Sequence, residues 1–141
     1  MRPYQHTITH SCLLANTLVA LPTGLGKTLI AAVVMFNYYR WFPTKKVIFL
    51  APTRPLVTQQ VVACSEIMGS GLPESDVAQL EGSVSVESRE SLWRTKRVFF
   101  CTPQVVENDI RSGICPATDI VCVVVDEAHR AASSNYAYAR V

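Results

Sequence analysis

The sequence predicts an α/β domain with a mostly parallel central sheet and helices on both faces. Apolar, strand-like runs alternate with longer helix-like segments along the whole chain, as parallel strands joined by right-handed crossovers require. The composition is 49% hydrophobic and 17% charged, with a mean hydropathy of +0.20, which suits a sheet covered on both sides. The 141 residues fit one domain of ordinary size.

Short apolar runs rich in β-branched residues mark the expected strands. The run IVCVVV has the strongest β-forming composition, and the first expected strand leads directly into a proline and a glycine-rich turn. In chain order, the expected strands are 16–21, 46–51, 77–80, 97–101 and 120–125.

Longer segments between these runs are expected to be helices. Residues 27–41 are long enough for a buried helix that stops before a proline. Residues 54–68 alternate apolar and polar side chains at helical spacing and end at Gly69. Residues 86–93 are expected as a short helix. Residues 103–113 have proline at the first helical position and glycine at the end.

The segment PTGLGKT has the composition of a phosphate-binding loop. Gly24 and Gly26 let the backbone bring its N–H groups close to phosphate oxygens. Lys27 offers an ammonium to the phosphates, and the Thr28 hydroxyl can ligate Mg²⁺. The strict pattern has one more glycine, where this chain has leucine, so a turn with a surface lysine stays open as the alternative. The expected nucleotide-binding residues of the loop are Pro22, Thr23, Gly24, Leu25, Gly26, Lys27 and Thr28.

The segment VVVDEAH supplies the carboxylates that such a loop needs at a neighbouring strand end. We expect Asp126 to hold Mg²⁺ through water and Glu127 to orient and deprotonate the attacking water. The alternative is that both acids cap a helix. Together with the loop, the pair of acids predicts that the protein binds ATP and Mg²⁺ and hydrolyses the ATP. His6 and His10 have an i, i+4 spacing, but no surrounding carboxylate pattern supports a metal site.

Other features restrict the function classes. Five cysteines without a C-x-x-C pair favour reduced core thiols over a zinc site or a disulfide framework. No apolar run reaches the roughly 18 residues of a membrane span, so no membrane partner is expected. The formal net charge of +2 is too small to indicate nucleic-acid binding, and that prediction depends on motifs.

The motifs LPTGLGKT, APTRPLVTQQ, TPQ and DEAH follow one another in the order found in superfamily 2 helicases, and they resemble motifs I, Ia, Ic and II of the first RecA-like domain. The longer strings LVALPTGLGKT, NYYRWFPTKKVIFLAPTRPLVTQQ and KRVFFCTPQVVENDIRSG are similar to the Fanconi anaemia group M family, which includes the archaeal Hef proteins. This resemblance covers nearly the whole chain and implies a RecA-like P-loop NTPase fold.

The resemblance also implies residue roles. Gln5 would read the adenine edge, and His129 would couple the ATP state to motif III. Glu81 stands where the family has threonine, which puts an acid near the expected phosphates. Sequence-independent contacts to the DNA backbone are implied for Thr53, Arg54, Pro55, Gly82, Ser83, Thr102 and Gln104.

The domain organisation follows from the same resemblance. Residues 1–141 are expected to be the first RecA-like, ATP-binding domain, incomplete at its C-terminus. The second RecA-like domain, which supplies the arginine finger, is expected to be absent, so this chain alone should have little activity. The parent protein is expected to be a nuclear DNA helicase or translocase that repairs forks and junctions. Two alternatives stay open: a Dicer-like or RNA-sensor-like helicase for duplex RNA, and a nucleotide-binding module without turnover.

Overall fold

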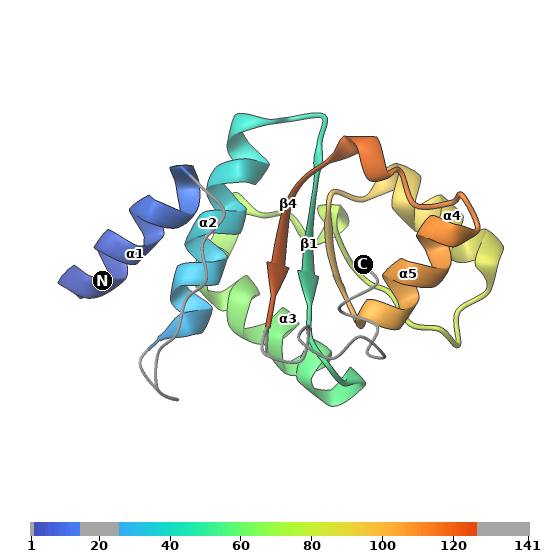
Figure 1. Ribbon diagram of the computed structural model, residues 1–141, viewed down its shortest axis with the longest axis horizontal. Coiled ribbons are helices and arrows are strands. Elements are labelled where there is room, and N and C mark those ends of the chain that lie inside the picture. The colour runs from blue at the N-terminus through green and yellow to red at the C-terminus, as the bar shows by residue number, and fades with distance from the viewer. Residues whose placement is uncertain (1, 15–25, 127–141) are drawn as a thin grey trace.

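The structure is a computed structural model that describes residues 2–14 and 26–126, which form an α/β fold (Figure 1). Four strands form one sheet in the order β2-β3-β1-β4, and every neighbouring pair is parallel. The predicted fold class is therefore confirmed. The expected strand 16–21 lies outside the described residues. The strands are β1 (Lys46–Leu50), β2 (Val77–Gln79), β3 (Val98–Cys101) and β4 (Ile120–Val125).

The helices connect these strands in the expected alternation. They are α1 (Pro3–Leu14), α2 (Lys27–Trp41), α3 (Arg54–Met68), α4 (Val86–Thr95) and α5 (Pro103–Arg111). Ser85 begins α4 by accepting a hydrogen bond from the Ser88 backbone N–H. Helix α5 ends two residues before Gly113, which takes a positive φ of 79° in the following turn. Short 3-10 turns also connect the elements, at Gly69–Gly71, Glu74–Asp76 and Ala117–Asp119.

The core lies on both faces of the sheet because successive strand residues point to opposite sides. On one face, buried residues of α2 and α3 pack against Val47 and Phe49. On the other face, Trp93 of α4 and Val106 of α5 pack against Ile48 and its neighbours. The central strand β1 is buried along its whole length. The expected two-sided burial therefore holds for the centre of the sheet.

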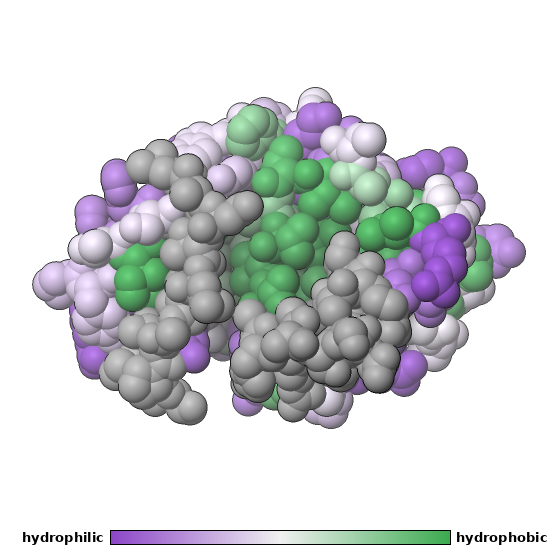
Figure 2. All heavy atoms as spheres, in the orientation of Figure 1, coloured by the Kyte–Doolittle hydropathy of each residue, from purple (hydrophilic) through white to green (hydrophobic). Residues whose placement is uncertain are grey.

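Strand β4 is less buried than the sequence predicts. It is the outer strand of the described sheet, beyond β1. Val123 is 48% exposed and Val125 is 37% exposed. Figure 2 shows hydrophobic residues gathered at the centre of this face, where Figure 1 places β4 and β1. The apolar run is therefore only partly covered: Val123 and Val125 are exposed, whereas Val124 packs against the core on the side of α2 and α3.

Arg97 organises the edge of the sheet where the strands begin. Its guanidinium donates to the carbonyl oxygens of Tyr39 at 2.8 Å, Phe42 at 2.7 Å and Lys45 at 3.1 Å. It also lies 4.0 Å from the centroid of the Tyr39 ring. Because the last carbonyls of a helix lack partners within the helix, Arg97 fixes the end of α2 and its turn into β1. Desolvation and a hydrogen bond to Asp76 raise the pKa of Tyr39.

The described residues agree with the expectation of core thiols. Cys64, Cys101 and Cys115 are buried and free, and Cys122 is half-buried. Helices α2 and α3, with 15 residues each, are the longest described ones, and no helix among the described residues is long and apolar enough to span a membrane. The described residues also contain no group of three or more side chains suited to hold a metal ion.

Candidate functional site

The predicted site residues gather at the edge where the parallel strands end. Figure 1 shows β1 and β4 ending on the side where α2 and α3 begin. Pro52 and Thr53 follow β1, Thr102 follows β3 and Asp126 follows β4. The backbone N–H of Asp126 donates to the Leu50 carbonyl at 2.8 Å, which extends the β1–β4 pairing to this residue. Ligands of parallel sheets bind at this edge.

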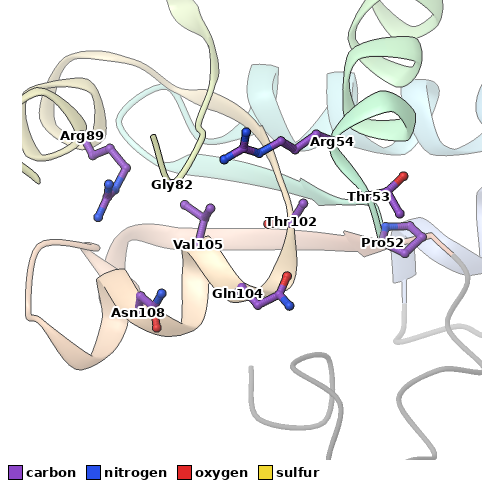
Figure 3. Close-up of a pocket in the computed structure, with 9 residues that line it drawn as sticks. All are labelled: Pro52, Thr53, Arg54, Gly82, Arg89, Thr102, Gln104, Val105 and Asn108. Atoms are coloured by element: carbon purple, nitrogen blue, oxygen red, sulfur yellow. The ribbon is translucent and has the colours of Figure 1, made fainter. Parts of the chain in front are cut away.

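A cavity of about 320 Å³ opens there between α3, α4 and α5 (Figure 3). Three connections contribute to it: the one after β1, the one after β2 and the one after β3. Figure 3 shows Arg54 extending from the start of α3 toward Gly82. The lining residues are Pro52, Thr53, Arg54, Gly82, Arg89, Thr102, Gln104, Val105 and Asn108.

Five of the seven residues expected to contact DNA line this cavity: Thr53, Arg54, Gly82, Thr102 and Gln104. The other two, Pro55 and Ser83, are exposed but do not line it. The five lining residues come from segments up to about fifty positions apart in the sequence, and the fold brings them together around one cavity.

Helices α3 and α5 start at the cavity, and the side chains of their N-cap residues make no capping hydrogen bond. Thr53 is the N-cap residue of α3 and Thr102 is the N-cap residue of α5, yet neither side chain makes a capping hydrogen bond. The first N–H groups of a helix have no partner within the helix and carry partial positive charge. The two hydroxyls and the two helix starts therefore form a polar rim suited to an anion.

The charge in the cavity comes mainly from Arg54. This side chain is exposed. The second lining cation, Arg89, is compensated by Asp109, to which it donates at 3.0 to 3.2 Å. Glu81, the acid that replaces threonine, accepts from Gln79 and Ser83 at 3.4 Å and is not a lining residue. The cavity therefore keeps a net positive character.

A buried polar network supports the far wall of the cavity. Asp109 of α5 is fully buried and accepts hydrogen bonds from Arg89 and, at 2.8 Å, from the indole N–H of Trp93. Arg89 also donates to the Val84 carbonyl at 2.5 Å. The network therefore ties α4, α5 and the connection after β2 together. Sequence reasoning missed it, because no spacing within the chain pairs an arginine of one amphipathic helix with an aspartate of the next.

The start of α2 is the described part of the predicted nucleotide loop. Gly26 precedes α2 with a φ of 82°, a left-handed conformation that favours glycine. A Cβ atom at this position would lie 2.0 Å from Nε2 of Gln5. Gln5 is buried and donates to the Gly26 carbonyl at 3.5 Å. The predicted adenine reader, on helix α1, is therefore packed against Gly26.

Lys27 and Thr28 form the first turn of α2. Lys27 is exposed. The Thr28 hydroxyl donates to Oε1 of Gln60 on α3 at 3.3 Å. Because this bond uses the only hydroxyl proton, the oxygen lone pairs stay available, as a metal ligand requires. The left-handed Gly26, the exposed ammonium and this hydroxyl fit a magnesium-bound nucleotide. Outside the described residues lie Pro22, Thr23, Gly24, Leu25, Glu127 and His129.

The family model for the DEAD/DEAH box helicases matches residues 2–139. The chain is 56% identical over 141 residues to the mouse (Mus musculus) Fanconi anemia group M protein homolog, covering 100% of this chain and 7% of the relative. It is 55% identical over 140 residues to the ATP-dependent DNA helicase fml1 of Schizosaccharomyces pombe, covering 99% of this chain and 16% of the relative.

Among solved structures, the chain is similar to the crystal structure of the Pyrococcus furiosus Hef helicase domain. The TM-score is 0.88 at 41% sequence identity, and the match covers 98% of this chain and 28% of that one. The chain thus spans only a small part of the proteins that it matches. The predicted resemblance to the Fanconi anaemia group M and Hef proteins, and to their RecA-like fold, is confirmed. The chain belongs to the DEAD/DEAH box helicase family.

Proposed function

We propose that this chain is the first motor lobe of an ATP-dependent DNA helicase or translocase that acts on branched DNA during repair. The observation that carries the proposal is the cavity of about 320 Å³, in which five predicted backbone-contact residues from three connections meet. The name of the fission yeast relative, an ATP-dependent DNA helicase, supports the choice of nucleic acid and energy source.

The cavity suits the phosphodiester backbone of one strand. Two threonine hydroxyls, two helix starts and the Arg54 guanidinium offer hydrogen-bond donors to phosphate oxygens. The exposed Gln104 amide adds a neutral donor to the lining. Phosphate contacts position a strand but carry no base identity, so binding here would be independent of sequence, as a motor that moves along DNA needs.

The nucleotide would bind at the start of α2. Lys27 would neutralise phosphate charge, Thr28 and Asp126 would hold the magnesium ion, and Gln5 would recognise the adenine. Glu127 would take the proton from the attacking water. When bound, magnesium-ATP supplies a phosphoanhydride whose hydrolysis releases the free energy for movement. Arg54 and its neighbours lie on the same edge of the sheet, so both ligands would be held by adjacent strand ends.

The proposed partner of this lobe is a second RecA-like domain of the parent protein, and His129 would couple the two through motif III. Residues 1–141 would then be one of two lobes, with the arginine finger on the other. ATP would draw the lobes together on the strand, and hydrolysis would release them. The substrate class, forks and junctions, and the nuclear location are part of this proposal and follow the group M resemblance.

The test is the ATPase activity of the full-length protein with forked DNA, single-stranded DNA and duplex RNA. We expect forked DNA to stimulate turnover most. Lys27→Ala and Glu127→Gln should abolish turnover, and Gln104→Ala should raise the DNA concentration needed for half-maximal stimulation while leaving the DNA-independent rate unchanged. Stronger stimulation by duplex RNA would favour the Dicer-like alternative, and nucleotide binding without any turnover would favour the binding module.

A further inference from the structure

Helix α3 contacts both proposed ligand sites. Its first residue, Arg54, lines the cavity proposed for DNA. Six residues later, Gln60 accepts the hydrogen bond from the Thr28 hydroxyl. Six residues of α-helix span about 9 Å, so the two contacts lie within two turns of one continuous helix.

We infer that Gln60 is a positioning residue that orients Thr28 for magnesium and couples nucleotide binding to the DNA cavity. The inference depends on the proposed function and extends it, because neither the motif resemblance nor the family match assigns a role to Gln60. The observation behind it is the hydrogen bond of 3.3 Å between Thr28 Oγ1 and Gln60 Oε1.

The orientation of the Thr28 hydroxyl follows from the number of hydrogen bonds that it can donate and accept. A threonine hydroxyl has one proton to donate and two lone pairs to offer. Since Gln60 accepts the proton, the lone pairs point away from α3. A side chain that fixes a metal ligand in this way changes metal affinity without touching the metal. Both side chains are half-buried, so the bond is partly shielded from competing water.

The coupling follows from the effect of a cation on a bound hydroxyl. Coordination to Mg²⁺ makes a hydroxyl more acidic and therefore a stronger donor, so the Thr28–Gln60 bond should strengthen when magnesium-nucleotide binds. This would tighten the contact between α2 and α3. A second bond, from Gln79 Nε2 to Thr58 Oγ1 at 2.8 Å, ties the same part of α3 to β2. The connection after β2 carries Gly82 into the cavity, so α3 is linked to two of its walls.

The matched pair Gln60→Met and Val62→Met tests the inference in the full-length protein. Methionine keeps the length and helix propensity of glutamine but lacks the acceptor. Val62 is 55% exposed on the same helix, so it controls for the introduction of methionine. Gln60→Ala is the second variant if the first does not fold. The readouts are the affinity for a fluorescent ATP analogue with Mg²⁺ and with EDTA, and the affinity for forked DNA with and without the magnesium-analogue complex.

We expect Gln60→Met to lower the magnesium-dependent nucleotide affinity by about tenfold, with the affinity in EDTA unchanged within about twofold. The nucleotide-dependent change in DNA affinity should also shrink, because the bond that would carry the coupling is absent. Because coupling is reciprocal, the DNA-dependent change in nucleotide affinity should shrink by the same factor as the nucleotide-dependent change in DNA affinity. Val62→Met should match the wild type in both assays.

If the wild type binds both the nucleotide and DNA, two results would overturn the inference and leave the proposed function standing. One is an unchanged magnesium-dependent affinity in the Gln60 variants. The other is an equal loss with magnesium and with EDTA, which would indicate a general structural role. A wild-type protein that binds neither the nucleotide nor DNA would overturn the proposed function, and the inference with it.

Discussion

Replacing Asp109 with alanine removes the carboxylate that accepts hydrogen bonds from both Arg89 and Trp93. Asp109 is fully buried and Arg89 is 8% exposed. The carboxylate accepts from Nε and Nη2 of Arg89 at 3.0 to 3.2 Å and from the Trp93 indole at 2.8 Å. The variant would leave a guanidinium and an indole N–H buried without these acceptors.

The expected cost is large because a buried charge loses its counterion. Breaking a buried ion pair by removing one partner typically costs about 3–5 kcal/mol, and an unsatisfied indole N–H adds about 1 kcal/mol. A domain is stable by about 5–15 kcal/mol in total, so Asp109→Ala should remove about a quarter or more of its stability. Asp109→Asn should lie between the wild type and alanine, because it keeps one acceptor oxygen but loses the charge.

Urea unfolding of the 141-residue chain measures this cost. Trp93 lies inside the network, so its fluorescence reports the local transition. With a slope of about 1–3 kcal/mol per M urea, the midpoint should fall by at least about 1 M. The double variant Arg89→Met/Asp109→Leu should cost less than the sum of the single changes, because no charge is left buried. A loss under about 1 kcal/mol for Asp109→Ala, or strict additivity in the double variant, would refute the reasoning.

Three further predictions concern other parts of the fold. Arg97→Ala should lower the free energy of unfolding by about 2–3 kcal/mol, because three carbonyls lose a charged donor. In urea titrations, Arg97→Lys should be no more stable than Arg97→Ala, since a lysine ammonium cannot reproduce the planar, forked donors of the guanidinium. Arg54→Gln should weaken binding to all DNA sequences alike and reduce the slope of log affinity against log salt by about 1; an unchanged slope would remove Arg54 from the phosphate contacts. Burial raises the pKa of the Cys64 thiol to about 12 and that of Cys115, beside Asp109, to about 11, so both should resist iodoacetamide at pH 8 until urea unfolds the chain, as peptide mass spectrometry can show. Since these folded-state pKa values lie above the ordinary thiol value of 9.0, their contribution to stability should be complete below pH 9 and decline as the pH rises toward 11. A urea midpoint that rises over this range would contradict the sign.

The sequence predicts the sheet and its helices well because both depend on local patterns. Apolar runs of strand length and helices bounded by proline or glycine give α2 and α3 at the expected residues, 27–41 and 54–68. The clustering of Thr53 and Thr102 at one edge also follows, because parallel strands end on the same side. A proline lies in the first turn of both α3 and α5, where its fixed φ favours the start of a helix.

The contacts between distant elements could not be predicted in the same way. Arg89 and Asp109 are twenty residues apart on different helices, and Arg97 reaches carbonyls more than fifty residues away. Such pairs depend on how helices pack over the sheet, which no single-sequence pattern encodes. The same limit applies to Gln60 and Thr28, whose bond joins two helices that simply look amphipathic or apolar in the sequence.

A structure of the full-length protein with forked DNA, magnesium and a nonhydrolysable ATP analogue is the sharpest test of the proposed function. We expect phosphates of one strand between the starts of α3 and α5, within hydrogen-bond distance of Thr53, Arg54 and Thr102. We also expect a magnesium ion held by Thr28 and Asp126. A strand that crosses another surface, with the cavity of about 320 Å³ filled by solvent, would contradict the proposed function.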